Sequence, residues 1–441
     1  MKEINDMFPN IAGYDKIKAE AAQLVDVLLN TEKYTERGAH CPRGWLFYGE
    51  PGMGKTQIVK DIGAYLDCPV IEISSSDAIN RNYSMQEDIL NGFAYAKKQS
   101  KAILFLDEID KFAGYDRFEY NLTENINNST MLLHELDGVK DIDGIFVIAT
   151  ANDLYLLSDS LLRSGRFDRK IKFCRPDSND REEIIKLFMK NAVLGNDVSI
   201  RELVRMTYGK SCAEIECLVN EAIISAVASR SDTVNLQDFN RALNRIVFKD
   251  IPRDSDTKSH RQIKEVAYHE AGHALLGCLI CPDRVQMVSI LHRGSSAGSV
   301  RILGDEQMVL SHSQYLDSIK IGLAGMYSVY VMTGEMTAGN QSDIQSCVET
   351  ARLMLDEGFY GVEYVTLLPP RGIEARSTEK YTDLRADKIA EILAEIRGEV
   401  ENILRQNKHV IEAIANRLVE EKELSSKEVQ SIIASNMAKA C

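Results

Sequence analysis

The chain contains 441 residues, of which 44% are hydrophobic and 27% charged, and its formal charge is −14 at pH 7. A chain of this length is expected to fold as two or three domains, each with enough apolar residues for a substantial core. The acidic balance argues against nucleic-acid binding, because contact with phosphates requires concentrated lysine and arginine.

No segment has the length and apolarity of a membrane span. The most apolar stretch, from Ile321 to Met332, is shorter than a bilayer-spanning helix and contains tyrosine and serine. The N-terminal sequence MKEINDMFPN lacks the apolar core of a signal peptide. Nine cysteines are scattered without a paired framework, which indicates reduced thiols. We therefore expect a cytoplasmic protein with no membrane span in this chain.

A phosphate-binding loop follows a helical lead-in over residues 11–40 and a predicted strand at Trp45–Tyr48. The run GEPGMGKT matches G-x-x-x-x-G-K-[ST] and precedes a helical pattern over Thr56–Leu66. In such a loop, backbone N–H groups surround the phosphates, the lysine reaches the β and γ oxygens, and the threonine ligates Mg²⁺. The predicted nucleotide-binding residues of this loop are Gly49, Glu50, Pro51, Gly52, Met53, Gly54, Lys55 and Thr56.

Further short apolar runs predict a parallel sheet in the first part of the chain. Helical patterns separate these runs, as in an α/β sheet that is covered on both faces. Asp107 and Glu108 follow one run directly. An aspartate at such a strand end can hold the Mg²⁺ shell, and the glutamate beside it can polarise the attacking water. The predicted strands are Val70–Ile73, Ala102–Leu106, Ile145–Ala149 and Ile171–Phe173.

The patterning along the chain predicts three domains and one linker. Residues 1–176 are expected to form the α/β nucleotide-binding domain, and residues 177–250, whose apolar residues recur at helical spacing, a helical lid. The polar residues 251–258 form the expected linker. Residues 259–441 are expected to form a mainly α-helical domain, with one short strand pair between residues 287–294 and the sequence SVRIL.

The third domain begins with a helical segment that carries the motif HEAGH. His269 and His273 stand four residues apart and therefore share one helix face, from which both imidazoles can reach one metal ion. Glu270 lies roughly 100° around the helix, where a general base takes a proton from zinc-bound water. Gly272 costs roughly 1 kcal/mol relative to alanine, which indicates a close packing contact. The pattern predicts a zinc hydrolase.

Tetrahedral zinc in a peptidase requires a third protein ligand. The pattern HExxHxxGxxH does not supply it here, because Leu276 and Leu279 stand where its glycine and its last histidine would be. Spacing alone leaves three carboxylates as candidates: Asp343, Glu335 and Glu349.

The C-terminal residues 384–441 are charged and helical. Ser425 and Glu428 form a capping box that predicts the start of a last helix. One helix has an apolar face, which indicates core or subunit packing rather than catalysis. That face consists of Ile389, Ile392, Leu393, Ile396, Val400, Ile403 and Leu404.

Several motifs occur in the order and approximate spacing of the FtsH-type ATP-dependent zinc metalloproteases of the AAA+ class. They are IAGYDKIKAE, GEPGMGKT, LFLDEID, TANDLYLLSDSLLRSGRFDR and HEAGH. The chain resembles this family from about Ile11 to about Gly358. The resemblance implies an AAA+ ATPase with a parallel sheet and a helical lid, followed by a mainly α-helical zinc metallopeptidase domain. It also implies the cofactors ATP, Mg²⁺ and Zn²⁺, and ATP hydrolysis that unfolds protein substrates and feeds them to the zinc site.

The resemblance also implies roles for individual residues. Asn152 takes the place of the polar sensor near the γ-phosphate. Arg163 and Arg166 look like arginine fingers that act across a subunit boundary in a homo-hexameric ring. Asp343, in the segment TAGNQSDIQ, takes the place of the third zinc ligand. The first motif adds Ala12 and Gly13 to the expected nucleotide-binding residues.

Three segments depart from the family pattern. Cys212, in GKSCAEI, replaces the usual glycine of a turn that touches the nucleotide. Tyr83 is the only aromatic candidate for the pore loop, whose glycines are missing. In LAGMYSVY, Met326 replaces an arginine, and Val329 and Tyr330 replace two acids.

Family members carry two transmembrane helices before the ATPase domain. This chain begins almost directly at that domain, so we expect the membrane tether to be lost or supplied by a membrane-anchored partner. The altered pore loop and the altered LAGMYSVY segment leave one alternative function open. In that alternative, the protein is an AAA+ remodelling ATPase whose peptidase half is degenerate or structural.

Overall fold

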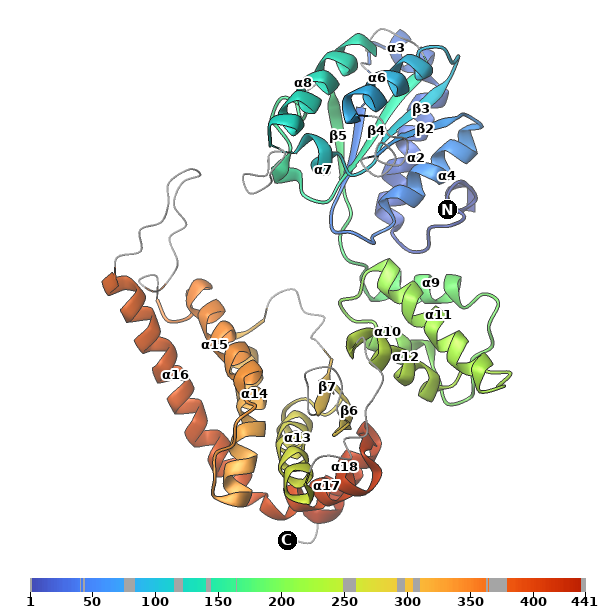
Figure 1. The fold of residues 1–441 in the computed structure, drawn as a ribbon. Helices are drawn as coiled ribbons and strands as arrows, with labels where there is room; N and C mark the ends of the chain where they lie inside the picture. Colours follow the sequence, from blue (N-terminus) through green and yellow to red (C-terminus); the bar gives the residue numbers. More distant parts are fainter. Residues whose placement is uncertain are drawn as a thin grey trace. The chain divides into compact units, whose positions relative to one another are not determined.

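The computed structural model describes residues 2–39, 41–42, 44–74, 84–114, 122–139, 144–163, 165–248, 259–291, 298–303, 310–361, 364 and 379–437. Tyr83 and the predicted linker 251–258 lie outside these residues. The chain forms two compact units, Met1–Leu243 and Asn244–Cys441, and Figure 1 labels most of their helices and strands.

A five-stranded parallel sheet organises the first unit, with the strand order β2-β3-β4-β1-β5. The sheet confirms the expected α/β class. β5 begins earlier than predicted, because three exposed charged residues separate its buried Phe167 from its buried Ile171, and such mixing of buried and exposed residues is typical of a sheet edge. The strands are β1 (Gly44–Tyr48), β2 (Val70–Ile73), β3 (Ala102–Leu106), β4 (Ile145–Ala151) and β5 (Phe167–Lys172).

Alternate residues of the central strands enter two separate cores, because successive side chains point to opposite faces of a sheet. Phe47 and Phe105 pack with helices α2 and α4, whereas Leu46 and Leu104 pack with α6 and α8. The sheet is therefore covered on both faces, as Figure 1 shows. The helices of this domain are α1 (Lys2–Met7), α2 (Asp15–Leu29), α3 (Thr31–Glu36), α4 (Lys55–Leu66), α6 (Met85–Ala96), α7 (Ile109–Ala113) and α8 (Leu122–Val139), and the short 3₁₀ turn Leu154–Leu156 follows β4.

Four helices form the lid: α9 (Ser178–Phe188), α10 (Ile200–Met206), α11 (Cys212–Ala228) and α12 (Leu236–Phe248). The boundary between the two units falls within α12. Two of these helices begin at capping boxes, in which side chains accept hydrogen bonds from backbone N–H groups that have no partner within the helix. Asp177 and Asp180 form a capping box on α9, and Ser211 and Glu214 form another on α11.

The second unit is mainly helical, with a small antiparallel sheet ordered β7-β6-β8. The predicted strand pair is β6 (Val285–Ser289) with β7 (Ser299–Ile302). β8 (Glu423–Ser425) was not predicted, because its three residues are held as a strand by pairing with β6, far away in sequence. The helices are α13 (His260–Ile280), α14 (His312–Thr333), α15 (Gln341–Asp356), α16 (Glu379–Gln406), α17 (Lys408–Glu421) and α18 (Ser426–Met437).

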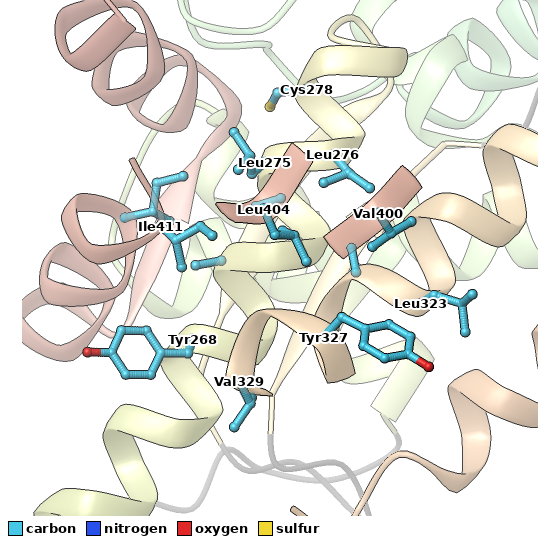
Figure 2. Close-up of a cluster of buried hydrophobic side chains, with 14 of the residues drawn as sticks. Tyr268, Leu275, Leu276, Cys278, Leu323, Tyr327, Val329, Val400, Leu404 and Ile411 are labelled. Atoms are coloured by element: carbon cyan, nitrogen blue, oxygen red, sulfur yellow. The ribbon is translucent and has the colours of Figure 1, made fainter. Parts of the chain in front are cut away.

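The core of the second unit lies between α13, α14, α16 and α17 (Figure 2). Leu275, Tyr327 and Ile411 are buried there, and the predicted apolar face of α16 packs into the same cluster. The capping box of Ser425 and Glu428 is formed at the start of α18. In the part of the chain that the structure describes, none of the helices combines the length and the apolarity that crossing a bilayer would require.

Gly272 lies at a close contact between α13 and α14. A Cβ atom at this position would lie 2.5 Å from the carbonyl oxygen of Ala324 and 2.5 Å from the Cβ of Ser328. The helix therefore contains glycine despite its low helix propensity, because a larger residue would force the two backbones apart. Gly398 in α16 is the opposite case, because a Cβ atom there would have no described neighbour within 4 Å.

We predict that Gly272→Ala destabilises the second unit by about 1–3 kcal/mol, since overpacking outweighs the gain in helix propensity. Gly398→Ala is the matched control and is expected to stabilise the unit by roughly 0.5–1 kcal/mol. Calorimetric melting of the full chain measures both effects. A higher melting temperature for Gly272→Ala would contradict the assigned contact.

Candidate functional site

The candidate metal centre begins with the two histidines of α13. A capping box between Ser259 and Gln262 starts this helix, and the helical repeat then brings His269 and His273 onto one face. Their Nε2 atoms are 3.0 Å apart. The local sequence is therefore sufficient to pair the two imidazoles.

Asp343 completes the centre from the first turn of α15. Its Oδ2 atom lies 3.1 Å from Nε2 of His269 and 3.5 Å from Nε2 of His273. Ligand atoms at zinc–ligand distances near 2 Å in tetrahedral geometry would be roughly 3.3 Å apart. Among the residues that the structure describes, these three form the only group of His, Cys, Asp and Glu donors that could hold a metal ion. The donor set and spacing fit zinc.

The backbone of α14 orients this cluster. The carbonyl oxygen of Ile321 lies 2.7 Å from Nδ1 of His273, so Nδ1 carries the proton and Nε2 presents its lone pair to a metal. A Cβ atom at Gly325 would lie 2.3 Å from Nε2 of His273 and 2.7 Å from Nε2 of His269. Glycine at this position is thus a steric requirement of the site, one that the sequence motifs did not reveal.

Burial and mutual hydrogen bonds shift the pKa values of the three side chains. Burial lowers the pKa of His269. Burial also lowers the pKa of His273, but the hydrogen bond with Asp343 and the nearby Glu270 outweigh that effect and leave it raised. Burial raises the pKa of Asp343, yet hydrogen bonds with both histidines hold it well below its usual value. A carboxylate therefore faces two imidazoles.

Glu270 lies beside the cluster. Its side chain is buried, and burial raises its pKa to about 7. A Cβ atom at Gly298 would lie 2.6 Å from Oε1 of Glu270, so a glycine backbone covers the carboxylate. Glu270, the three candidate ligands and residues of β7 line a cleft of about 800 Å³. This position suits a proton acceptor.

The two rival carboxylates lie elsewhere. Glu335 is exposed and bonds Arg261, with 2.6 Å between Oε2 and Nη2. Glu349 is exposed and pairs with Arg352 at 3.1 Å. Only Asp343, of the three candidates left open by spacing, is brought to the imidazoles.

The LAGMYSVY segment of α14, which departs from the family pattern, contributes to packing. Val329 is buried in the core of the second unit, and Met326 packs partly buried against it. The ring of Tyr330 lies beneath the guanidinium of Arg405, 5.9 Å from its centroid. The residues that replace the family's charged side chains therefore do not remove any donor of the metal cluster.

We predict that Asp343→Ala and His273→Ala lose zinc, because each removes one of three donors. Wild-type protein is expected to contain about one zinc per chain, and Glu335→Ala and Glu349→Ala, as matched controls, the same amount. Elemental analysis after dialysis against a weak chelator measures the content. Retention of zinc by Asp343→Ala, or its loss from a control, would show that the third donor is misassigned.

The phosphate loop surrounds the side chain of Lys55. Its Nζ atom donates to the carbonyl oxygens of Gly49 and Glu50, at 2.6 and 2.8 Å, and to Oδ1 of Asn152 at 2.9 Å. Gly52 and Gly54 have φ angles of 77° and 88°, a left-handed conformation that favours glycine. The loop therefore depends on its glycines for shape.

Acidic residues at the end of β3 are held by the neighbouring strand β4. The hydroxyl of Thr150 donates to Oδ1 of Asp107 at 2.6 Å and accepts from the backbone N–H of Glu108 at 2.8 Å. The hydroxyl of Thr56 also donates to Asp107, at 3.2 Å. Thr150 thus orients both acids, a role that no motif in the sequence indicated.

Asn152 connects Glu108 to Lys55 through hydrogen bonds. Its Nδ2 group donates to Oε1 of Glu108 at 3.1 Å, while its Oδ1 atom accepts from Lys55. Lys111 bonds the other oxygen of Glu108. Burial raises the pKa of Glu108, but the bonds from Lys111 and Asn152 outweigh burial and keep it below its usual value. Glu108 is thus ionised and oriented.

A cleft of about 690 Å³ lies over this loop. Its lining residues from the sequence prediction are Ala12, Pro51, Gly52, Met53, Gly54, Lys55, Thr56, Asp107, Glu108 and Asn152. Phe188, Cys212 and Ala213 close it from the lid.

Three predicted nucleotide-binding residues do not line this cleft. Gly49 and Glu50 hold Lys55 through their carbonyl oxygens, and the Glu50 carboxylate bonds Arg175 at 2.8 Å. Gly13 packs against Asp180, where a Cβ atom would lie 2.7 Å from the Asp180 Cα. These residues support the wall of the cleft.

Neither candidate arginine finger lines the cleft of its own chain. Arg163 is exposed. Arg166 forms two hydrogen bonds with Asp137, at 2.8 and 3.2 Å, and a third with the carbonyl oxygen of Ser160 at 2.7 Å. Neither arginine is therefore positioned to contact a nucleotide bound in the cleft of its own chain.

We predict that Thr150→Ala lowers kcat for ATP hydrolysis roughly fivefold to tenfold, since losing an orienting hydrogen bond costs about 1–1.5 kcal/mol. Thr150→Ser keeps the hydroxyl and should retain most of the rate. Thr130→Ala removes an exposed hydroxyl that bonds its own helix and should leave kcat unchanged. Steady-state phosphate release measures all three, and an unaffected Thr150→Ala enzyme would exclude the orienting role.

Comparisons with protein families match most of the chain. Residues 45–175 match the ATPase family associated with various cellular activities (AAA), residues 197–241 the AAA+ lid domain, and residues 256–432 peptidase family M41. The matched regions contain the phosphate loop, the lid and the metal cluster, respectively.

Three curated relatives illustrate the similarity. The ATP-dependent zinc metalloprotease FtsH 2 of Thermoanaerobacter sp. is 31% identical over 433 residues, which cover 98% of this chain and 83% of the relative. FtsH 3 of Symbiobacterium thermophilum is 31% identical, with 97% and 71% covered. FtsH of Synechococcus sp. is 32% identical, with 97% and 70% covered.

Proposed function

The chain belongs to the FtsH family of ATP-dependent zinc metalloproteases, and we propose that it unfolds proteins with ATP and cleaves them at the HEAGH centre. As in the family, its cofactors are zinc and ATP and its substrates are proteins. The observation that carries the peptidase assignment is the convergence of His269, His273 and Asp343 within 4.8 Å of one another, beside the buried carboxylate of Glu270.

The hydrolytic step uses these residues in separate roles. His269, His273 and Asp343 would hold zinc, which supplies Lewis-acid activation of the water and of the scissile carbonyl when bound. Glu270 accepts the proton of the attacking water and passes it to the leaving amine nitrogen. Its buried position beside the three candidate ligands suits both directions of this transfer. One side chain therefore removes the proton from the water and delivers it to the leaving amine nitrogen.

The substrate backbone is expected to align with β7. This strand is an edge of the described sheet, and Ser299, Val300 and Ile302 line the cleft beside Glu270. An extended peptide can add to such an edge through main-chain hydrogen bonds. Because these hydrogen bonds involve only the peptide backbone, this mode of binding suits unfolded segments of varied sequence.

The residues of the first cleft divide the work on ATP. Lys55 would contact the β- and γ-phosphates, Thr56 and Asp107 would hold Mg²⁺, and Glu108 would polarise the attacking water. Asn152 stands between the lysine and the glutamate and senses the γ-phosphate. The hydrogen bonds among these residues support this division.

AAA proteins assemble into oligomers, and we propose a homo-hexameric ring for this chain. Arg163 and Arg166 would then reach the ATP of a neighbouring subunit and stabilise the charge that develops on the transferred phosphoryl group. The exposure of Arg163 and the absence of both arginines from their own cleft support action in trans. Hydrolysis would depend on assembly.

The assignment is tested by separating the two activities. Glu270→Gln removes the proton acceptor and should lower casein cleavage by roughly 10²–10⁴-fold, with ATPase activity retained. Lys55→Ala removes the phosphate-binding ammonium and should stop both ATP hydrolysis and degradation of a folded reporter. Cleavage of a short unstructured peptide should persist in Lys55→Ala, because such a peptide needs no unfolding.

Equal casein cleavage by wild type and Glu270→Gln would refute the catalytic role of Glu270 and favour a structural peptidase half. Degradation of the folded reporter by Lys55→Ala would instead refute ATP-driven unfolding. Glu265→Gln is a suitable control, because Glu265 lines the same cleft but pairs with Arg261 at its rim.

A further inference from the structure

Tyr14 occupies a junction of the first unit that no motif assigned. It precedes α2, is 7% exposed, and lines the nucleotide cleft. Its φ angle of 54° lies in the left-handed region, which is unfavourable for a tyrosine. Such a conformation persists only where the surroundings enforce it, and these positions cluster at ligand clamps and switch regions.

Hydrogen bonds from Tyr14 reach the lid and the connection that leads to it. Its backbone N–H donates to Oδ1 of Asp180 in α9 at 2.6 Å. Its phenol donates to the carbonyl oxygen of Cys174, between β5 and α9, at 2.9 Å. One residue thus ties the N-terminal segment to both the connection and the first lid helix.

The same phenol contacts both walls of the cleft. The thiol of Cys212, at the start of α11, donates to the Tyr14 oxygen at 3.5 Å, and the sulfur of Met53 in the phosphate loop lies 3.7 Å from it. Next to this contact, the backbone N–H of Ala213 donates to the carbonyl oxygen of Gly52 at 3.0 Å. The lid and the phosphate loop meet at Tyr14.

Burial keeps the phenol protonated and therefore available as a donor, since it raises the pKa of Tyr14 far above its usual value. Cys212 stands where the family has glycine, and its thiol supplies a partner that glycine lacks. The phenol thereby accepts from the lid while it donates to the β5–α9 connection. Cys212 therefore adds a contact between the lid and Tyr14 that glycine could not make.

We propose that Tyr14 is a positioning residue that holds the lid against the phosphate loop and so preforms the nucleotide cleft. The inference rests on the proposed nucleotide site. Among the described residues, the N–H and phenol contacts of Tyr14 reach the lid, the β5–α9 connection and Met53, and its carbonyl oxygen accepts from the N–H of Lys18 in α2. None of these contacts reaches Lys55 or Glu108. Tyr14 therefore governs nucleotide affinity rather than the chemical step, since preorganisation lowers the cost of binding.

The test compares Tyr14→Phe with wild-type full-length chain. Tyr14→Phe removes the phenol's bonds to the Cys174 carbonyl and to the Cys212 thiol. The loss should raise KM for ATP, and the dissociation constant for a fluorescent ADP analogue, by at least the roughly 2- to 12-fold that one such bond is worth, with kcat within about twofold of wild type. Tyr34→Phe is the matched control, because its phenol donates to Asp26 at the surface, and both constants should stay unchanged.

Cys212 provides the second variant. Cys212→Ser keeps a donor to the phenol and should bind nucleotide nearly as wild type does, whereas Cys212→Ala should weaken binding. In the double variant Tyr14→Phe/Cys212→Ala, the two losses of nucleotide affinity should be less than additive, because both substitutions remove the same contact between phenol and thiol.

Unchanged affinity in Tyr14→Phe, or a fall in kcat at constant KM, would overturn the proposal, as would full additivity of the two substitutions. Binding of the ADP analogue requires no hydrolysis and no proteolysis. Failure of this proposal is therefore distinguishable from failure of the proposed function.

Discussion

The close crossing of α13 and α14 is the constraint on which the metal centre depends. Gly272 lets the backbone of α14 approach α13, and Gly325 lets that backbone lie against both imidazoles. This approach brings the Ile321 carbonyl oxygen to His273 and encloses the apolar cluster of Figure 2. Packing and chemistry therefore share one interface, and a methyl group at either glycine would disturb both.

The two units build their sites by the same means. In each, a short motif on one helix or loop supplies the first groups, and a segment far away in sequence completes them. Asp343 reaches the HEAGH histidines from α15, and Asn152 reaches Lys55 from the end of β4. Because each site needs two elements in register, each forms only when its unit folds. Binding of zinc or nucleotide would in turn stabilise that fold.

The departures from the family pattern fall into two kinds. Val329 is buried in the core and Tyr330 lies in a cation–π contact with Arg405, so neither residue alters the donors of the metal centre. Cys212 is different, because its thiol takes part in the contact between lid and phosphate loop. A substitution at a domain junction can change how parts move, whereas one in a packed core mainly changes stability.

Local patterns in the sequence determined the α/β class, most strand positions, the phosphate loop and the pairing of His269 with His273, since these follow from short-range periodicity. Side-chain spacing did not choose between Asp343 and its two rivals, and the tertiary structure did so by bringing Asp343 alone to the imidazoles. The roles of Thr150 and Gly325, and the strand β8, were seen only in the tertiary structure. Those features depend on contacts between residues far apart in the chain, for which side-chain spacing along one helix or strand carries no information. Resemblance to a family had named Asp343; the fold supplied the physical reason.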